Sequence, residues 1–528
     1  MPENVAIEQA RSVAVIDIGS NSIRMVIAQV KPDGSFETLE RVQRPVRLGH
    51  STFVTGRLSE QTMDAAIAVL RDYRRLCENY NIVTLRAVAT SAVREATNND
   101  AFLDRAGISA DIDVEIIEPA EESRLTVSAV KEEIDGCLNI KDGPAVVVEV
   151  GGGSALVTIL KEGRIAVSEG YNLGSIRLQE ILGTADMPPD RAADIFRRHI
   201  ASVVTAMQRT MPIRGAKHFI AVGGDARLAA QIAGKVVAEP NIFELPVEAL
   251  EGFVKKCSRL TPQELARAHG VPFANAETLT PALIAYLALL KASRCPKMLV
   301  AHVSMRDGLL LDLARALGGK EDPELVASTV QAAQSIGEKY QYDARHAQHV
   351  AEMSLKLFDA LKAAHRLSVR DRLLLHVAAL LHEVGGFVSS RAHHKHSYYL
   401  ISNSVIVGLR RDELDMVALM ARYHRRSGPK SSHPEYMALP RGQRMVVNKL
   451  AALLRVADAL DRAHEERVKE FTAEVRGTEL LITVPAVEMM LEQRALDRKA
   501  DLLEEAYGLK ARIVEAGPAP TAPSAEPA

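Results

Sequence analysis

The chain has 528 residues, of which 47% are hydrophobic and 25% are charged, so we expect roughly three or four globular domains with sizeable cores. Lys and Arg together number 65 against 67 Asp and Glu, and the resulting net charge of −2 argues against a nucleic-acid-binding protein. We expect neither a membrane span nor a secretory leader, since no long apolar run and no basic-then-apolar start is present. The four cysteines lie far apart, which indicates reduced thiols in a cytoplasmic protein.

The first predicted element is a hairpin near the N-terminus. Residues 13–18 read as a buried strand that ends with the carboxylate of Asp17, and a short polar turn leads into a second strand. Gly19 in the turn lets backbone N–H groups approach an oxyanion closely, and small polar side chains add further donors. The pattern predicts a phosphate cradle with contacts from Ser20, Asn21 and Ser22.

A helix over 60–80 and a strand over 84–89 follow, and a polar cluster at the end of this strand contains Arg94. A guanidinium at a strand end is well suited to bind a phosphate. The alternative is a helix N-cap at Thr90 or Ser91 with a surface arginine behind it.

A second polar cluster places Glu121 and Glu122 at the predicted start of a helix. Glutamates there interact favourably with the positive end of the helix dipole, which accounts for at least one of them. The other could activate water, as hydrolysis of a phosphoanhydride requires.

The plan of the first hairpin is repeated at 145–159, where Glu149 occupies the place of Asp17. A lone glycine-rich hairpin most often only reverses the chain. Two such hairpins with an acid at the same offset are expected where two half-domains close over a cleft. The second turn therefore predicts further phosphate contacts from Gly151, Gly152, Gly153 and Ser154.

The order of predicted elements indicates α/β structure before a Gly- and Pro-containing linker at 317–323, and helical periodicity after it. A short strand–helix–strand unit and a Pro/Ala-rich tail, which we expect to be disordered, complete the chain. The predicted domains are 1–135 and 136–317 (α/β), 324–470 (all-α), 471–515 (small α+β) and 516–528 (tail).

Five motifs between 17 and 225 resemble the exopolyphosphatase/guanosine pentaphosphate phosphatase (Ppx/GppA) family in their order and spacing. They are Asp17 to Ser22, Thr90 to Arg94, Glu121 to Arg124, Glu149 to Ser154 and Ala221 to Asp225. The resemblance implies two ribonuclease-H-like subdomains of the actin-like ATPase superfamily around a cleft. It also implies a homodimer.

For the site, the resemblance implies that Glu121, rather than Glu122, is the base that activates water, and that Asp17 and Glu149 lie near Mg²⁺. The terminal phosphates would then bind to the turn residues and to Arg94. Two positions depart from the family pattern. Glu149 and Leu156 stand where many members have Asp and Glu, which bears on the number of Mg²⁺ ions, and the charge of Asp225 leads us to assign its turn no catalytic role.

The helical region contains eleven of the sixteen histidines and resembles an HD-type metal phosphohydrolase domain. Histidine and carboxylate on facing helices can bind a divalent metal, which predicts a second metal site there. The alternative is a scaffold without metal, since Glu383 replaces the usual Asp of the His-Asp pair. The motifs are His346 to His349, His382 with Glu383, and Asp458 to Asp461, and the site could be extended by His394, His396 and His424.

Residues 391–449 carry eleven Lys or Arg against four Asp or Glu, a local net charge of +7. Such an excess would attract and retain a long polyanion, whereas the alternative is an ordinary solvated helix face. The predicted polyphosphate-binding patch comprises His394, Lys395, His396, Arg422, Arg425 and Arg426.

The leading functional prediction is an exopolyphosphatase that uses Mg²⁺ and a glutamate-activated water to release orthophosphate from inorganic polyphosphate. The same cleft could instead act as a guanosine pentaphosphate (pppGpp) 5′-phosphohydrolase. A third alternative, from a different class, is a phosphate or nucleotide sensor that binds without catalysis. We expect no nucleic-acid or membrane partner.

Overall fold

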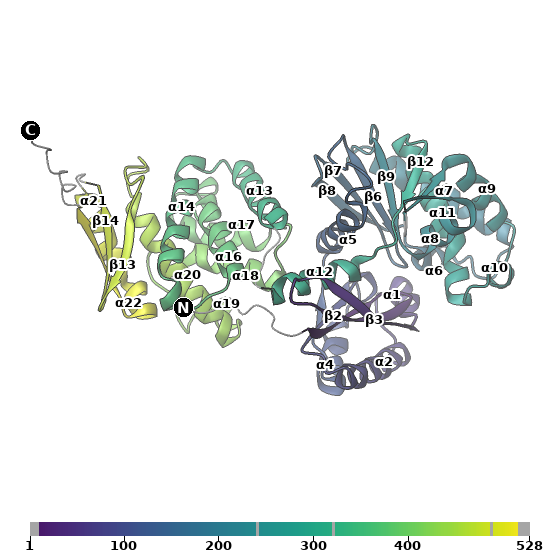
Figure 1. Ribbon diagram of the computed structural model, residues 1–528, viewed down its shortest axis with the longest axis horizontal. Helices are drawn as coiled ribbons and strands as arrows, with labels where there is room; N and C mark the ends of the chain where they lie inside the picture. Colours follow the sequence, from purple (N-terminus) through teal and green to yellow (C-terminus); the bar gives the residue numbers. More distant parts are fainter. Residues whose placement is uncertain (1–9, 239–241, 319–322, 486–488, 516–528) are drawn as a thin grey trace, which may run out of the picture. The chain divides into compact units, whose positions relative to one another are not determined.

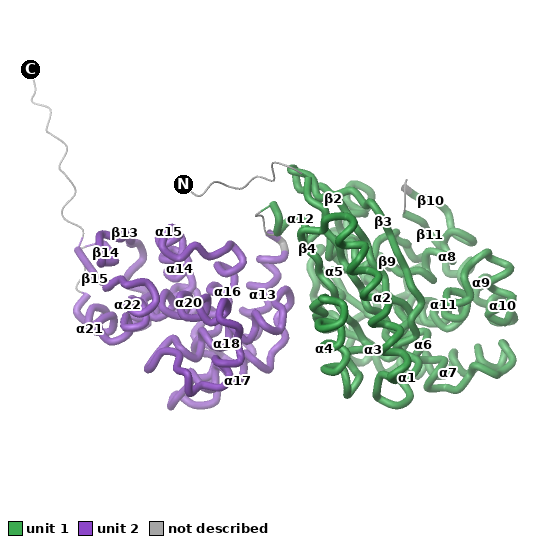
Figure 2. The backbone as a smooth tube through the Cα atoms, turned by 90° about the horizontal axis from the view of Figure 1, so that it is seen from below, with its two compact units in different colours: residues 1–320 green, residues 321–528 purple. Residues whose placement is uncertain are grey.

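The computed structural model describes residues 10–238, 242–318, 323–485 and 489–515 (Figure 1). The chain forms two compact units, Met1–Lys320 and Glu321–Ala528 (Figure 2). The boundary lies inside the predicted linker. The predicted disordered tail, 516–528, lies outside the described residues.

The first sheet of unit 1 has five strands in the order β3-β2-β1-β4-β5, with β1 antiparallel to β2 and parallel to β4. Alternate residues of β1 enter different cores, because Ile16 packs with helix α2 on one face and Val15 packs with helix α12 on the other. Burial on both faces explains why this strand reads as a continuous apolar run. The strands are β1 (Arg11–Ile18), β2 (Ser22–Val30), β3 (Phe36–Pro45), β4 (Thr84–Ala89) and β5 (Val114–Ile116).

The second sheet of unit 1 has seven strands in the order β10-β11-β12-β9-β6-β7-β8. Its strand β6 repeats the pattern of β1, since Val148 packs with α7 and α11 while Val147 packs with α5 on the opposite face. The strands are β6 (Ala145–Val150), β7 (Ala155–Lys161), β8 (Arg164–Tyr171), β9 (His218–Val222), β10 (Lys235–Ala238), β11 (Ile242–Pro246) and β12 (Lys297–Val300).

Helices cover the faces of both sheets (Figure 1). Helix α11 is long and apolar enough to cross a membrane by length and composition alone, but 61% of its most apolar window is buried, as expected for a core helix. The helices are α1 (Leu48–Thr55), α2 (Glu60–Asn79), α3 (Ser91–Arg94), α4 (Asn99–Ala110), α5 (Pro119–Ile134), α6 (Ser175–Leu182), α7 (Pro189–Met207), α8 (Gly224–Ala233), α9 (Val247–Cys257), α10 (Pro262–His269), α11 (Phe273–Ser293) and α12 (Met305–Leu317).

Unit 2 is a helical assembly with a three-stranded sheet at its C-terminal end (Figure 1). Ile482 of the sheet and Leu453 of α20 belong to the same hydrophobic core, so the predicted boundary at 470/471 does not separate two cores. The elements are α13 (Pro323–Lys339), α14 (Ala344–Ala360), α15 (Lys362–His365), α16 (Val369–Leu381), η1 (Val384–Phe387), α17 (His393–Ser402), α18 (Arg411–Tyr423), α19 (Pro434–Met437), α20 (Arg441–Leu460), β13 (Thr472–Arg476), β14 (Glu479–Val484), α21 (Met490–Lys499), α22 (Asp501–Tyr507) and β15 (Lys510–Glu515).

Candidate active site

The two predicted hairpins have the same backbone construction. Ile18 pairs with Ile23 at the base of the first turn, and Val150 pairs with Ala155 at the base of the second. Each turn is closed by a backbone hydrogen bond, of 3.1 Å between Gly19 N and Ser22 O and of 2.9 Å between Gly151 N and Ser154 O. The duplication read from the sequence is therefore a duplication of geometry.

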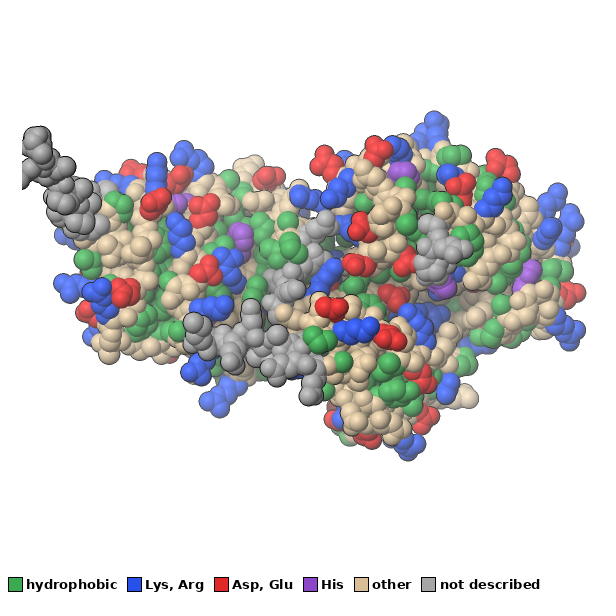
Figure 3. All heavy atoms as spheres, viewed as in Figure 1, with side chains coloured by type: hydrophobic (Ala, Val, Ile, Leu, Met, Phe, Trp, Pro, Cys, Tyr) green, Lys and Arg blue, Asp and Glu red, His purple; other side chains and the backbone are tan. Residues whose placement is uncertain are grey.

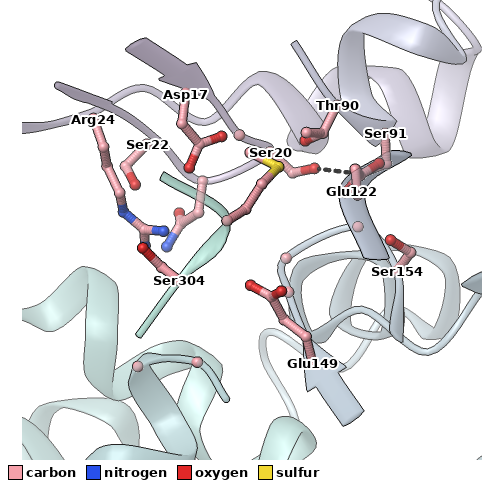
Figure 4. Close-up of a pocket in the computed structure, with 18 of the residues that line it drawn as sticks. Asp17, Ser20, Ser22, Arg24, Thr90, Ser91, Glu122, Glu149, Ser154 and Ser304 are labelled. Atoms are coloured by element: carbon pink, nitrogen blue, oxygen red, sulfur yellow. Dashed lines mark hydrogen bonds between the residues drawn. The ribbon is translucent and has the colours of Figure 1, made fainter. Parts of the chain in front are cut away.

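Both turns open on one cavity of about 110 Å³ (Figure 4). They approach so closely that a Cβ atom on Gly153 would lie 2.0 Å from Ser91 Oγ and 2.7 Å from Ser20 Oγ. Only glycine at this position permits the approach. The predicted phosphate-binding residues that line the cavity are Ser20, Asn21, Ser22, Gly151, Gly152, Gly153 and Ser154.

The two carboxylates predicted to lie near Mg²⁺ also line this cavity (Figure 4). Asp17 accepts a hydrogen bond of 2.8 Å from Arg306, and Glu149 accepts one of 2.9 Å from Thr126 Oγ1. Burial raises the pKa of Glu149, and the nearby charge of Asp17 adds to this shift. Oxygen ligands of this kind, which repel one another in a buried cavity, fit a hard divalent cation.

Of the two adjacent glutamates of α5, Glu122 lines the cavity and Glu121, which the sequence predicts as the catalytic base, does not. The Glu121 carboxylate is held by Arg124 through two hydrogen bonds of 2.8 Å, and Arg86 lies 3.7 Å away. Adjacent residues of a helix point about 100° apart, so only one of these two glutamates of α5 can face the cavity. Burial raises the pKa of Glu122 to about 7, although the neighbouring Arg94 opposes this shift.

Arg94 supports this glutamate and is not among the residues that line the cavity. Its Nη1 donates hydrogen bonds of 2.6 Å to Glu122 Oε1 and 2.5 Å to the carbonyl oxygen of Ile117. These contacts hold the Glu122 carboxylate in place, and the phosphate-binding role of Arg94 stays a prediction. The predicted cap residues Thr90 and Ser91 both line the cavity.

Three arginines of the cavity were missed in the sequence: Arg24, Arg227 and Arg306. Burial and the charge of Arg306 lower the pKa of both Arg24 and Arg227. Guanidinium groups that repel one another inside a cavity are stabilised when an anion binds between them. Arg24 could have been found, because it pairs with Asp17 across the hairpin, whereas the other two come from distant parts of the chain.

Two further cavities, of about 330 and 490 Å³, share these three arginines with the first. The second is lined by Asp225, Gln231 and Asn275, and burial raises the pKa of Asp225 to about 6. The turn before Asp225, which the sequence analysis excluded from the site, contributes Gly223 and Gly224 to the first cavity.

In unit 2, the structure brings several predicted metal ligands together in two groups that share Glu383. Asp461, which belongs to neither group, contacts the Nδ1 atom of His346. The histidine that joins the second group is His393, which was not predicted, and not the predicted His394. The groups are His346, His382, Glu383 and Asp458, and Glu383, His393 and His424.

The predicted polyphosphate-binding patch is only partly exposed. Lys395 and Arg426 are exposed, but His394 is buried, with 7% of its surface accessible, so the structure removes it from the patch. Arg422 lies 3.3 Å from Glu435, and Arg425 lies 3.1 Å from His393 Nε2. His396 is half-buried. Both acidic and basic side chains occur on the face in Figure 3.

The family model described as "Ppx/GppA phosphatase family" matches residues 11–317, and the one described as "Ppx/GppA phosphatase, domain III" matches residues 329–506. The chain belongs to the Ppx/GppA phosphatase family. It is therefore a hydrolase, and its two units correspond to the two matched regions of that family.

Among curated relatives, the guanosine-5′-triphosphate,3′-diphosphate pyrophosphatase of Aeromonas hydrophila is 26% identical over 484 residues, covering 90% of this chain and 92% of that protein. The enzyme of the same name from Vibrio vulnificus is 25% identical over 485 residues, again covering 90% and 92%. A solved exopolyphosphatase from Cytophaga hutchinsonii is 21% identical and covers 58% of this chain and 98% of its own, with a TM-score of 0.52. This last likeness shows that the Ppx/GppA fold is shared.

Proposed function

We propose that this Ppx/GppA protein removes the terminal 5′-phosphate of guanosine 5′-triphosphate 3′-diphosphate (pppGpp). The observation that carries the proposal is a buried glutamate, Glu122, on the wall of a cavity that also holds two glycine-rich turns and three arginines. This combination supplies both a base and a phosphate-binding site.

In the proposed reaction, a water oxygen attacks the terminal phosphorus while the bond to the bridging oxygen breaks. Glu122 orients the water and accepts its proton, and the hydrogen bond from Arg94 fixes the direction of the carboxylate. The products are orthophosphate and the guanosine bis-diphosphate. A pKa near 7 suits this role, because a base works best when its pKa lies close to the operating pH.

Backbone N–H groups of both turns and the three cavity arginines would bind the non-bridging oxygens of the terminal phosphates. Asp17 and Glu149 would hold Mg²⁺, since both are oxygen donors that line the same cavity. When bound, this ion offsets the charge that develops on the phosphate oxygens.

Two observations support a nucleotide substrate. Relatives that match 90% of this chain are named for guanosine-5′-triphosphate,3′-diphosphate. The second cavity adjoins the phosphate site through the shared arginines, and its walls carry the carboxylate and amide groups of Asp225, Gln231 and Asn275, which are suited to hydrogen-bond a base or ribose.

Inorganic polyphosphate is the second candidate substrate. The third cavity continues from the same three arginines and adds Arg41 and His302 to the lining, so a linear polyanion could extend along it. A larger kcat/KM for long polyphosphate than for pppGpp would favour this candidate.

The test measures orthophosphate release from pppGpp, GTP and long-chain polyphosphate with the same purified chain. We expect the highest kcat/KM with pppGpp, and we expect Asp225→Asn to lower it selectively for pppGpp while the value for polyphosphate changes little. Binding of pppGpp without phosphate release would instead support the sensor. Light scattering would test the predicted homodimer.

Matched variants of the adjacent glutamates test the mechanism. Glu122→Gln should reduce kcat by about 10²–10⁴-fold, as is typical for loss of a general base. Glu121→Gln should have a much smaller effect, because its side chain is occupied by Arg124. The reverse order of effects would return the catalytic role to Glu121 and contradict the proposed mechanism.

A further inference from the structure

The histidine centre of unit 2 comprises the two ligand groups that share Glu383, and it is distinct from the phosphate site of unit 1. Within each group the candidate ligand atoms lie within 4.8 Å of one another. Most of these side chains are buried, so their polar atoms need partners inside the protein. The six residues are His346, His382, Glu383, His393, His424 and Asp458.

Three of the histidines are oriented by an oxygen on the far side of the ring. The Nδ1 atoms of His382 and His424 lie 2.6 and 2.5 Å from the carbonyl oxygens of Ala379 and Ala421, three residues earlier in each case. A ring with Nδ1–H donated to a carbonyl carries its lone pair on Nε2. The Nε2 atom of His382 is buried and has no hydrogen-bond partner.

His346 has the same arrangement with a carboxylate. Its Nδ1 lies 2.7 Å from Asp461 Oδ2, and its Nε2 is buried without a hydrogen-bond partner. An imidazole held by a carboxylate on one nitrogen and free on the other is the usual geometry of a metal-binding histidine. Two buried, unpartnered Nε2 atoms therefore point to a cation between them.

The carboxylate of Glu383 faces both groups with different oxygens. Its Oε2 lies 3.9 Å from His346 Nε2, and its Oε1 lies 3.6 Å from His393 Nε2. Within the groups, Asp458 Oδ1 is 3.8 Å from His346 Nε2, and the Nε2 atoms of His393 and His424 are 3.2 Å apart. Two ligands bound at about 2.1 Å to one ion are themselves about 3–4 Å apart, which these separations match.

We propose that the histidine centre binds two transition-metal dications, with Glu383 as the bridging ligand. Nitrogen-rich donor sets favour such metals over Mg²⁺. The first ion is held by His346, His382 and Asp458, and the second is held by His393 and His424.

Two positively charged side chains, Lys499 and Arg425, border the histidine centre and determine the order in which the two metal ions bind. Lys499 pairs with Asp458 through Oδ2, which leaves Oδ1 directed at His346. Arg425 lies 3.1 Å from His393 Nε2, so the second ion has to displace this guanidinium and binds more weakly than the first. Removal of metal from the centre should therefore proceed in two steps.

The test uses the full chain without an affinity tag, loaded with Zn²⁺ in the presence of excess Mg²⁺ to occupy oxygen-ligated sites of the cleft. Mass spectrometry of the dialysed protein should find about two Zn²⁺ per chain. Substitution by Co²⁺ should produce visible absorption bands that report nitrogen ligands. Glu383→Gln should lose at least one Zn²⁺, and His376→Asn, in the α16 helix that ends directly before His382 but outside both groups, should retain two.

A second variant keeps the test decisive if Glu383→Gln does not fold. Asp461→Asn leaves every proposed ligand in place and weakens the hold on His346, while its amide oxygen can still accept the hydrogen bond from Glu466 N. We therefore expect Zn²⁺ affinity at the first site to fall by roughly 10–100-fold. The proposal is overturned if the wild-type chain, fully loaded, retains fewer than two Zn²⁺. It is equally overturned if folded Glu383→Gln or Asp461→Asn protein binds Zn²⁺ as the wild type does.

Discussion

The two hairpins of the candidate active site share a backbone but differ in the side chain that lies across from the acid. In the first hairpin Asp17 pairs with Arg24, whereas in the second Glu149 pairs with Leu156. The first hairpin therefore contributes charged side chains to the cavity. The second contributes the backbone of Gly153, which lies close to Ser20 and Ser91. One duplicated backbone frame thus contributes charge at one hairpin and shape at the other.

The largest expected effect comes from making the first hairpin like the second. Arg24→Leu removes a half-buried guanidinium from all three cavities, so we expect kcat/KM for phosphate release to fall by about 10²–10³-fold. Arg24→Lys is the matched control, since it keeps the charge and should recover part of the loss. Equal activity of Arg24→Leu and wild type would show that this side chain does not contact the substrate.

The shape contribution of the second hairpin is tested by Gly153→Ala. The new Cβ would lie 2.0 Å from Ser91 Oγ, and displacement of the turn should lower kcat on the order of 100-fold. Gly151→Ala is the control, because its nearest new contact, Ser154 O at 3.6 Å, is an ordinary one. Thermal unfolding of both variants separates a local shift from loss of the fold.

Asp17 and Glu149, the acids of the two hairpins, should affect the pH dependence of kcat/KM, because their charges act on Glu122. The pKa of Glu122 is raised to about 7 by burial, with additional contributions from Glu149 and Asp17. Below this pKa the carboxyl is protonated and cannot accept a proton, so kcat/KM should fall about tenfold per pH unit below pH 7. Glu149→Gln removes one repelling charge and should move this limb to lower pH. An unchanged limb would mean that another group titrates.

The smallest expected effect comes from restoring a carboxylate to the second hairpin. Leu156→Glu places a second acid across from Glu149, which should lower the Mg²⁺ concentration needed for half-maximal activity by roughly a few-fold. Leu156→Gln is the uncharged control. A requirement for more Mg²⁺ in the Glu variant would place the ion away from the second hairpin.

The sequence predicted both hairpins and their glycines because these features depend on residues close together in the chain. It did not show that Glu122, rather than Glu121, lines the cavity, because neighbouring residues of a helix face different directions and the contacts of Arg124 with Glu121 and of Arg94 with Glu122 arise only in the fold. Arg227 and Arg306 could not be found, since the fold brings them to the cavity from distant segments. His393 was missed for a similar reason, as its proximity to Glu383 depends on how α17 packs.

The three arginines shared by the adjoining cavities have a consequence for the pace of turnover. A product that has lost one phosphate still carries several, and it would remain on the same guanidiniums. Departure of the shortened nucleotide, rather than cleavage, would then limit the steady-state rate. Phosphate release in the first turnover would appear as a rapid burst. Moderate salt would speed later turnovers, because it weakens the binding of the product to the arginines.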